Sequence, residues 1–267
     1  MTYTDEMIPL RYGDPKMPDY LLTELYLRAS KHSQYQTIAP VLKDMVDESA
    51  ISETSRYEAE RMDYIMSYVD IVGKKCLDIG GNTGYFSFRS LEEGGTSVDY
   101  YEGNDSHAAF VKRAAELLGW TDRLKIIPTY YDFNIGKDKG YDVCFLLNVL
   151  HHAGVDYGDV IADVKEAGAT IRKQISGMSK ESEYLVLQLG FNWGGDITKP
   201  LFEKGTKREM IDFVQDACRT VWDIIGIGIA EKCDEKVEYV DLNEENVRRN
   251  DSLGEFLNRP LFILRRA

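Results

Sequence analysis

The sequence lacks the features of a membrane protein or a secreted protein. No apolar run approaches the roughly 18 residues of a membrane-spanning helix. The N-terminal segment MTYTDEMIPLRYGD contains no hydrophobic core of a signal peptide. We therefore expect a cytoplasmic protein that does not contact a membrane.

Cysteine is also scarce. The chain has four cysteines, and no two of them have the C-x-x-C spacing of zinc ribbons and zinc fingers: Cys76, Cys144, Cys218 and Cys233. We predict no metal site. Disulfides are not expected either, because the secretion signal that would take the chain to an oxidising compartment is missing.

Basic residues are fewer than acidic ones. Lysine and arginine number 32, against 45 aspartates and glutamates, which gives a net charge of −13. This charge repels phosphate backbones and disfavours non-specific nucleic-acid binding, although a local basic patch could still hold one structured RNA. The remaining composition, 43% hydrophobic and 29% charged, is that of an ordinary soluble protein. A chain of 267 residues can form one large domain with a cap.

Hydrophobic patterns divide the chain into two parts. Residues 1–55 have helical patterns and are assigned to an N-terminal helical cap, and residues 56–267 to the main domain. There, short apolar runs alternate with helical patterns, which is typical of a mostly parallel sheet with helices on both faces. The expected strands lie at 74–81, 97–102, 124–127, 141–147, 184–189, 224–230 and 261–264, with a further candidate at 237–241, and the expected helices at 85–95, 105–118, 159–176 and 207–221. Such sheets bind ligands beyond the carboxyl ends of their strands.

A glycine loop follows the first of these strands. Gly80, Gly81 and Gly84 do not fit the dinucleotide-binding spacing G-x-G-x-x-G. Asp78 puts a carboxylate at the end of the strand, which is unfavourable beside a pyrophosphate and suits a ligand with positive charge. Glu102 ends the second strand, where its carboxylate can accept hydrogen bonds from two ribose hydroxyls. The alternatives are a tight turn without a ligand, and an Asp78 that caps the next helix.

These residues resemble the motifs of class I S-adenosylmethionine-dependent methyltransferases. Asp78, Gly80 and Gly84 match the first motif of the family, with Asn82 in place of its central glycine, and Glu102 matches the acid that ends strand two. The resemblance covers about residues 56–190. It implies a Rossmann-like, mostly parallel sheet of seven strands. It also implies that the cofactor is S-adenosylmethionine, with S-adenosylhomocysteine as the product.

The resemblance also implies further cofactor contacts. Asp132 and Phe133, in TYYDF, match the acid and hydrophobic residue after strand three, and Asp132 would contact the adenine amino group. The backbone near Asn148, in YDVCFLLNVLHH, would contact the methionine amino group. Arg56 would reach the methionine carboxylate. The alternatives are a turn residue at 132, a core aromatic at 133 and a surface salt bridge at 56.

The acceptor side of the site is predicted from the carboxyl edge. His151 and His152 follow the fourth strand, and histidine is the side chain most able to take a proton near neutral pH, so we predict that at most one of them is the catalytic base. Asn192 and Trp193 follow the fifth strand within GFNWGGD, and with Tyr85 they are expected to contact the substrate. The alternatives are structural histidines and an aromatic plug between strand and helix.

The sequence therefore predicts a methyltransferase of the small-molecule or glycan type. The predicted reaction is O-methylation of a sugar, a glycan or a secondary metabolite, and the protein is considered a candidate homodimer. The segment 56–95 also distantly resembles enzymes that alkylate tRNA wobble uridines, and methyltransferases that cap polysaccharide chains. A tRNA-modifying enzyme is therefore one alternative, and an inactive binding module with the same fold is another.

Overall fold

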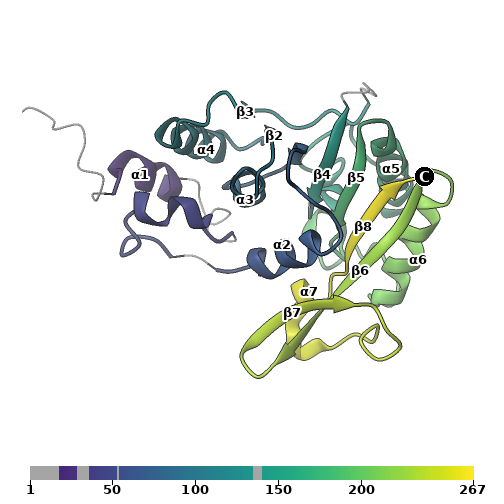
Figure 1. The fold of residues 1–267 in the computed structure, drawn as a ribbon. Coiled ribbons are helices and arrows are strands. Elements are labelled where there is room, and N and C mark those ends of the chain that lie inside the picture. Colours follow the sequence, from purple (N-terminus) through teal and green to yellow (C-terminus); the bar gives the residue numbers. More distant parts are fainter. Residues whose placement is uncertain (1–17, 29–35, 53, 135–139) are drawn as a thin grey trace, which may run out of the picture.

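The computed structural model describes residues 18–28, 36–52, 54–134 and 140–267. A single mixed sheet of eight strands forms its centre (Figure 1). The strand order across the sheet is β3-β2-β1-β4-β5-β8-β6-β7. The strands are β1 (Lys75–Ile79), β2 (Ser97–Tyr101), β3 (Leu124–Ile127), β4 (Tyr141–Leu147), β5 (Ser182–Gln188), β6 (Trp222–Cys233), β7 (Lys236–Asp241) and β8 (Leu261–Arg266).

The predicted count of seven strands is wrong, because 236–241 also joins the sheet. Cys233 pairs with Lys236, so a two-residue turn at Asp234 and Glu235 connects β6 to β7 as a hairpin. Strands β1 to β5 are parallel, whereas β8 pairs antiparallel with both β5 and β6. The mostly parallel, doubly covered half of the sheet, which ends at β5, is as predicted.

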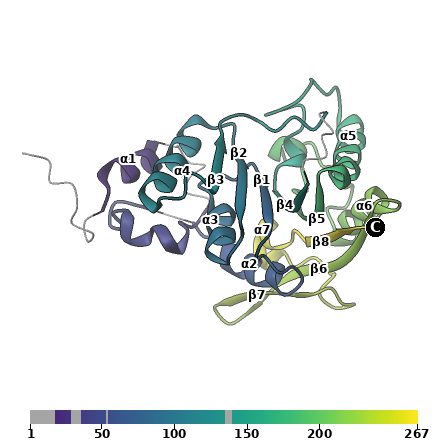
Figure 2. The same ribbon diagram turned by 45° about the horizontal axis from the view of Figure 1, so that its top comes forward.

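Side chains alternate across the sheet into two separate cores. On β4, Val143 and Phe145 belong to a first core on one face of the sheet, while Cys144 and Leu146 belong to a second core on the opposite face. A strand that is buried on both faces reads as a continuous apolar run, as YDVCFLL does. The first core is covered by α2 (Glu58–Met66), α3 (Tyr85–Glu92) and α4 (Asp105–Leu118). The second is covered by α5 (Val164–Gly177) and α6 (Lys207–Cys218), which lie together in both views (Figures 1 and 2).

Capping residues explain where the helices begin. Helix α4 spans the predicted residues. Its N-cap is Asn104, whose side chain accepts from the backbone N–H groups of Ser106 and His107. Helix α5 begins five residues later than predicted, because Asp163 caps it by accepting from the backbone N–H of Glu166. Thr206 forms a full capping box with Glu209 at the start of α6.

The segment before α2 packs against the layer formed by α3 and α4. Helix α1 (Tyr20–Arg28) lies beside α4 (Figure 1), with the rings of Tyr26 and Phe110 5.7 Å apart and an ion pair of 2.5 Å between Asp19 and Arg113. The short helix η2 (Pro40–Met45) contributes Leu42 to the same core. Residues 31–35 of KHSQYQ, including His32, lie outside the described residues. In the described part of the chain, no helix is long and apolar enough to cross a membrane.

Candidate active site

Two adjoining cavities lie beyond the carboxyl ends of β1, β2 and β4. The first, of about 510 Å³, is called the Arg-lined cavity because Arg56, Arg61 and Arg259 form its wall. The second, of about 390 Å³, is called the Glu102 cavity after the carboxylate beside it. Residues of the glycine loop and of the segment after β4 line both: Ile79, Gly80, Asn82, Asn148, Val149 and His152. One ligand that spans this border would reach into both cavities.

The glycine loop is shaped by close packing and by left-handed backbone. Gly80 has φ +68°, and a Cβ there would lie 2.6 Å from the Cγ2 atom of Val149. At Gly81, a Cβ would lie 2.5 Å from the ring of Tyr100 and 2.7 Å from the Oδ2 atom of Asp78. Both contacts are too short for any side chain. Asn82 also has a positive φ of 52°, which asparagine tolerates better than most residues.

Glu102 points toward this loop and not into bulk solvent. Its Oε2 atom accepts the backbone N–H of Asn82 at 2.9 Å, and its Oε1 atom accepts the backbone N–H of Asn104 at 2.8 Å. Burial raises the pKa of this half-buried carboxylate. Each oxygen can accept a further hydrogen bond, so the geometry suits the two hydroxyls of a ribose.

Asp78 lies directly under the loop, in the wall of the Arg-lined cavity. Its side chain is buried, and its Oδ2 atom accepts from the Ser87 hydroxyl at 2.7 Å. Burial, with a smaller effect from the charge of Glu102, raises the pKa of Asp78 to about 7. A cation in the cavity would favour its ionised form.

The two residues after β3 differ in position. Phe133 lines the Glu102 cavity, and its ring lies 5.1 Å from that of Tyr131 and 5.3 Å from that of Tyr157. Asp132 is exposed, and it is not among the described residues that line either cavity. Its Oδ1 atom accepts the backbone N–H of Asn134 at 2.8 Å, so it forms a turn. The structure gives no support to the predicted adenine contact of Asp132.

The two adjacent histidines have different surroundings. His151 is buried, and its Nδ1 atom accepts the backbone N–H of Gly190 at 3.1 Å. Burial lowers the pKa of His151 well below its usual value, and therefore the ring stays neutral with its proton on Nε2. His152 is half-buried and lines both cavities, and its Nδ1 atom lies 2.7 Å from the Oδ2 atom of Asp156. This pairing would stabilise a protonated His152.

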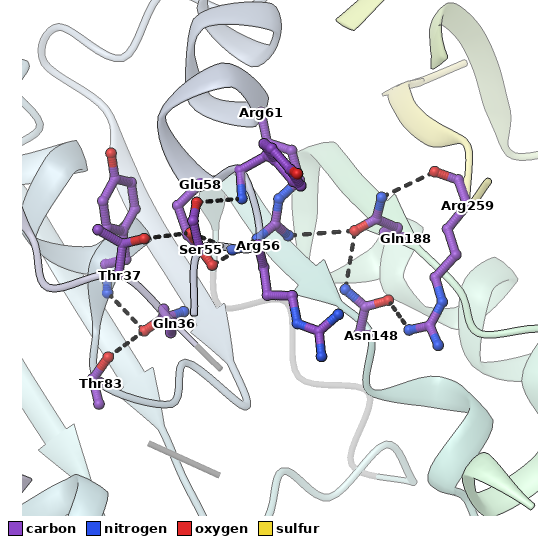
Figure 3. A network of polar contacts seen from close by, with 12 residues as sticks. Gln36, Thr37, Ser55, Arg56, Glu58, Arg61, Thr83, Asn148, Gln188 and Arg259 are labelled. Carbon is purple, nitrogen blue, oxygen red and sulfur yellow. Dashed lines mark hydrogen bonds and ion pairs between the residues drawn. The ribbon is translucent and has the colours of Figure 1, made fainter. Parts of the chain in front are cut away.

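A polar network joins the Arg-lined cavity to the ends of β4 and β5 (Figure 3). The side-chain oxygen of the fully buried Gln188 accepts from Arg61 at 3.3 Å and from Asn148 at 2.9 Å. The side-chain oxygen of Asn148 accepts from Arg259 at 2.8 Å. Arg61 also pairs with the buried Glu58 at 3.3 Å. These bonds hold the guanidinium groups of Arg61 and Arg259 in fixed directions.

The predicted substrate residues lie outside both cavities within the described part of the chain. Trp193 is buried, and its indole N–H donates to the carbonyl of Ala153 at 2.7 Å. Asn192 donates to Glu255 at 3.1 Å. Tyr85 is buried with its ring against Phe86. Their positions give no support to direct substrate contact, and Trp193 matches the alternative of an aromatic plug.

Several residues of the site were not found by sequence reasoning. Asp156, Gln188, Phe256 and Arg259 follow no motif that the sequence analysis used, and Arg61 lies within an ordinary helical pattern. The position of Arg61 among the apolar residues of the 56–69 pattern was a usable signal, because a buried arginine needs a partner for its charge. Among the described residues, no three His, Cys, Asp or Glu side chains gather in a way that could hold a metal ion.

Comparison with known proteins reveals a likeness in structure only. No family model matches the sequence, and a search of curated proteins finds no significant match. The chain is similar to WbdD, a bifunctional kinase-methyltransferase. One WbdD structure has a TM-score of 0.59 at 14% identity over 91% of this chain and 40% of that one. A second WbdD structure has a TM-score of 0.55 at 14% identity over 91% of this chain and 46% of that one.

The chain has the class I S-adenosylmethionine-dependent methyltransferase fold. It spans less than half the length of either WbdD chain. A proposed RNA methyltransferase from Pyrococcus horikoshii has a TM-score of 0.46 at 12% identity, over 92% of this chain and 98% of that one. With a score below 0.5, that likeness carries no further conclusion. At such identities the comparisons establish the fold and leave the substrate open.

Proposed function

We propose that the protein is an S-adenosylmethionine-dependent methyltransferase that methylates an oxygen atom of a small polar acceptor, such as a sugar, a glycan or a secondary metabolite. The observation that carries the proposal is the position of the His152–Asp156 pair. It lies where the Glu102 cavity meets the Arg-lined cavity, beside the glycine loop. A base in this position can serve a hydroxyl that enters from the Arg-lined cavity.

The residues present suit the methyl donor. S-adenosylmethionine supplies an activated methyl group on a cationic sulfur. In the Glu102 cavity, the carboxylate of Glu102 would bind the ribose hydroxyls of the donor, and the ring of Phe133 would pack against its adenine base. Asp78 would lie near the positive charges of its methionyl end in the Arg-lined cavity. Donor and acceptor would then be held in line, which is the main contribution a protein makes to such a displacement.

Of the two histidines, His152 is the proposed base. A hydroxyl becomes a competent nucleophile when its proton is removed as the new bond forms. With Nδ1 of His152 held at Asp156, the acceptor proton would pass to Nε2, and the carboxylate would stabilise the resulting imidazolium. His151 suits this role less well, because its Nδ1 lone pair already accepts the backbone N–H of Gly190 and the proton of the neutral ring is on Nε2.

Calorimetric titration with S-adenosylmethionine tests the donor site, and no binding at millimolar donor would contradict the proposal. The base is tested with radiolabelled donor and a panel of sugars and glycans. We expect His152→Ala to lower kcat by about 10²- to 10⁴-fold, a typical loss for a general base, with donor affinity nearly unchanged. Asp156→Asn should cause a smaller loss, because the carboxylate that would stabilise the imidazolium is gone. Unchanged rates in both variants would show that another group takes the proton.

Two alternatives are separated by simple experiments. Filter binding with bulk tRNA at low salt tests the RNA-modifying enzyme, which the net charge of −13 disfavours. A chain that binds the donor but methylates nothing in a cell extract would favour an inactive binding module.

A further inference from the structure

Three arginines converge on one aromatic ring in the wall of the Arg-lined cavity. The guanidinium carbons of Arg56, Arg61 and Arg259 lie 4.9, 5.3 and 5.5 Å from the ring centre of Phe256. They come from the loop before α2, from α2 itself and from the segment after α7 (Gly254–Leu257). Figure 3 labels all three, with Gln188 and Asn148 between Arg61 and Arg259. Burial and the charges of Arg56 and Arg61 lower the pKa of Arg259, so the like charges are close enough to act on one another.

Positive charge exceeds negative charge in this cavity. Among the described residues that line it, the acidic side chains are Glu58 and Asp78, and Glu255 pairs with Arg259 from outside the lining. Asp78 is only partly ionised at neutral pH because its pKa is about 7, so the three arginines still exceed the ionised acids. The methionyl end of the donor carries an ammonium and a sulfonium against one carboxylate, so its arrival adds to the positive charge. The acceptor is the remaining component that can bring negative charge.

Two of the guanidinium groups are already oriented. Arg259 is held by the side-chain oxygen of Asn148 at 2.8 Å and by Glu255 at 2.6 Å. Arg61 is held by Gln188 and Glu58, as described above. A planar guanidinium that is fixed in advance loses little conformational freedom when it binds the oxygens of a phosphate or a carboxylate. His152 lines the same cavity, so an anion bound there would place the rest of the acceptor near the proposed base.

We propose that Arg56, Arg61 and Arg259 bind an oxyanion of the acceptor, a phosphate or a carboxylate attached near the hydroxyl that is methylated. The inference rests on the proposed function, since it concerns the acceptor of the same reaction. It narrows the acceptor class from polar small molecules and glycans in general to those that carry an anionic group.

The experiment measures anion binding to protein saturated with S-adenosylhomocysteine. Inorganic phosphate and acetate are titrated separately by calorimetry at constant ionic strength, with glycerol as an uncharged probe. We expect at least one anion to bind, and Arg56→Gln to weaken that binding about tenfold, the typical effect of losing a charge-assisted hydrogen bond. Arg56→Lys should restore part of it. Arg219→Gln, which removes one exposed arginine from the end of α6, is the matched control and should have no effect.

The outcomes separate this inference from the proposed function. Failure of S-adenosylhomocysteine to bind would contradict the proposed function itself. If it binds and neither anion binds its complex, the oxyanion site is refuted. If the anions bind only the free protein and compete with S-adenosylhomocysteine, the arginines serve the donor carboxylate, and the inference is also overturned. Arg259→Gln repeats the test from the other side of the ring, and the relative affinities for phosphate and acetate indicate which oxyanion the acceptor carries.

Discussion

If the proposed function holds, Asp78 should make donor binding depend on pH. In the folded protein without donor, burial raises the pKa of Asp78 to about 7. A bound ligand with positive charge near this carboxylate would lower that pKa, typically by about 1–3 units. Binding is therefore coupled to ionisation, and the release of protons is largest at pH values between the pKa of Asp78 in the bound protein and its pKa in the free protein.

The expected magnitudes follow from this linkage. At pH 6 about 90% of Asp78 is protonated before binding. For a lowering of about 1–3 units, the affinity should be about five- to tenfold weaker than its plateau above pH 8, and about 0.4–0.9 proton should be released. At pH 8 the release should fall to about 0.1 proton. In the protein without donor, the raised pKa of Asp78 lowers the stability of the fold as the pH rises, whereas it strengthens donor binding. The free energy of unfolding decreases as the pH rises from 3.8 to about 7, because the unfolded chain ionises first.

Calorimetry in two buffers with different ionisation enthalpies measures both the affinity and the number of protons released. In Asp78→Asn, which has nearly the same shape, the affinity should be weak and almost independent of pH. Asp216→Asn, a control at an exposed carboxylate on α6, should behave like the wild type. The reasoning is refuted if the wild type releases no proton at pH 6. It is also refuted if Asp78→Asn releases as many protons as the wild type, which would assign the titration to another group, such as Glu102.

Two substitutions test other parts of the site. Glu102→Gln should weaken S-adenosylhomocysteine binding about tenfold, because a charged acceptor of hydrogen bonds is lost. The control, Glu116→Gln on the exposed side of α4, should have no effect. Equal affinities in the two variants would show that the ribose lies elsewhere. Gly190→Ala should lower the Tm by roughly 2–10 °C, because its Cβ would lie 2.6 Å from the ring of His151 and such overpacking costs about 1–3 kcal/mol. Gly177→Ala at the end of α5, where a Cβ meets nothing within 4 Å, is the control, and an equal Tm in the two variants would contradict the packing argument.

The meeting of the glycine loop and Glu102 at one edge of the sheet could be predicted from the sequence because it depends on local geometry, and their contact with a donor stays a prediction. Each of Gly80, Asn82 and Glu102 lies at the end of a strand or in the turn that follows it, and parallel strands bring such ends together at one edge. Phe133 lines the Glu102 cavity, and its predicted contact with the cofactor stays a prediction. Asp132 shows the limit of this reasoning, since a carboxylate in a turn satisfies its hydrogen bonds locally as often as it binds a ligand.

The alternation of strands and helices, the apolar run of β4 and the glycine loop after β1 can be read from the sequence alone, because each depends on neighbouring residues. The proposed acceptor side depends on tertiary packing. Arg56, Arg61 and Arg259 are separated by up to two hundred positions and meet at the ring of Phe256. The proposal of His152 over His151 as the base also depends on packing, because His151 packs under Gly190 and His152 faces the carboxylate of Asp156. Contacts between distant segments depend on how whole elements pack, and no local pattern records them.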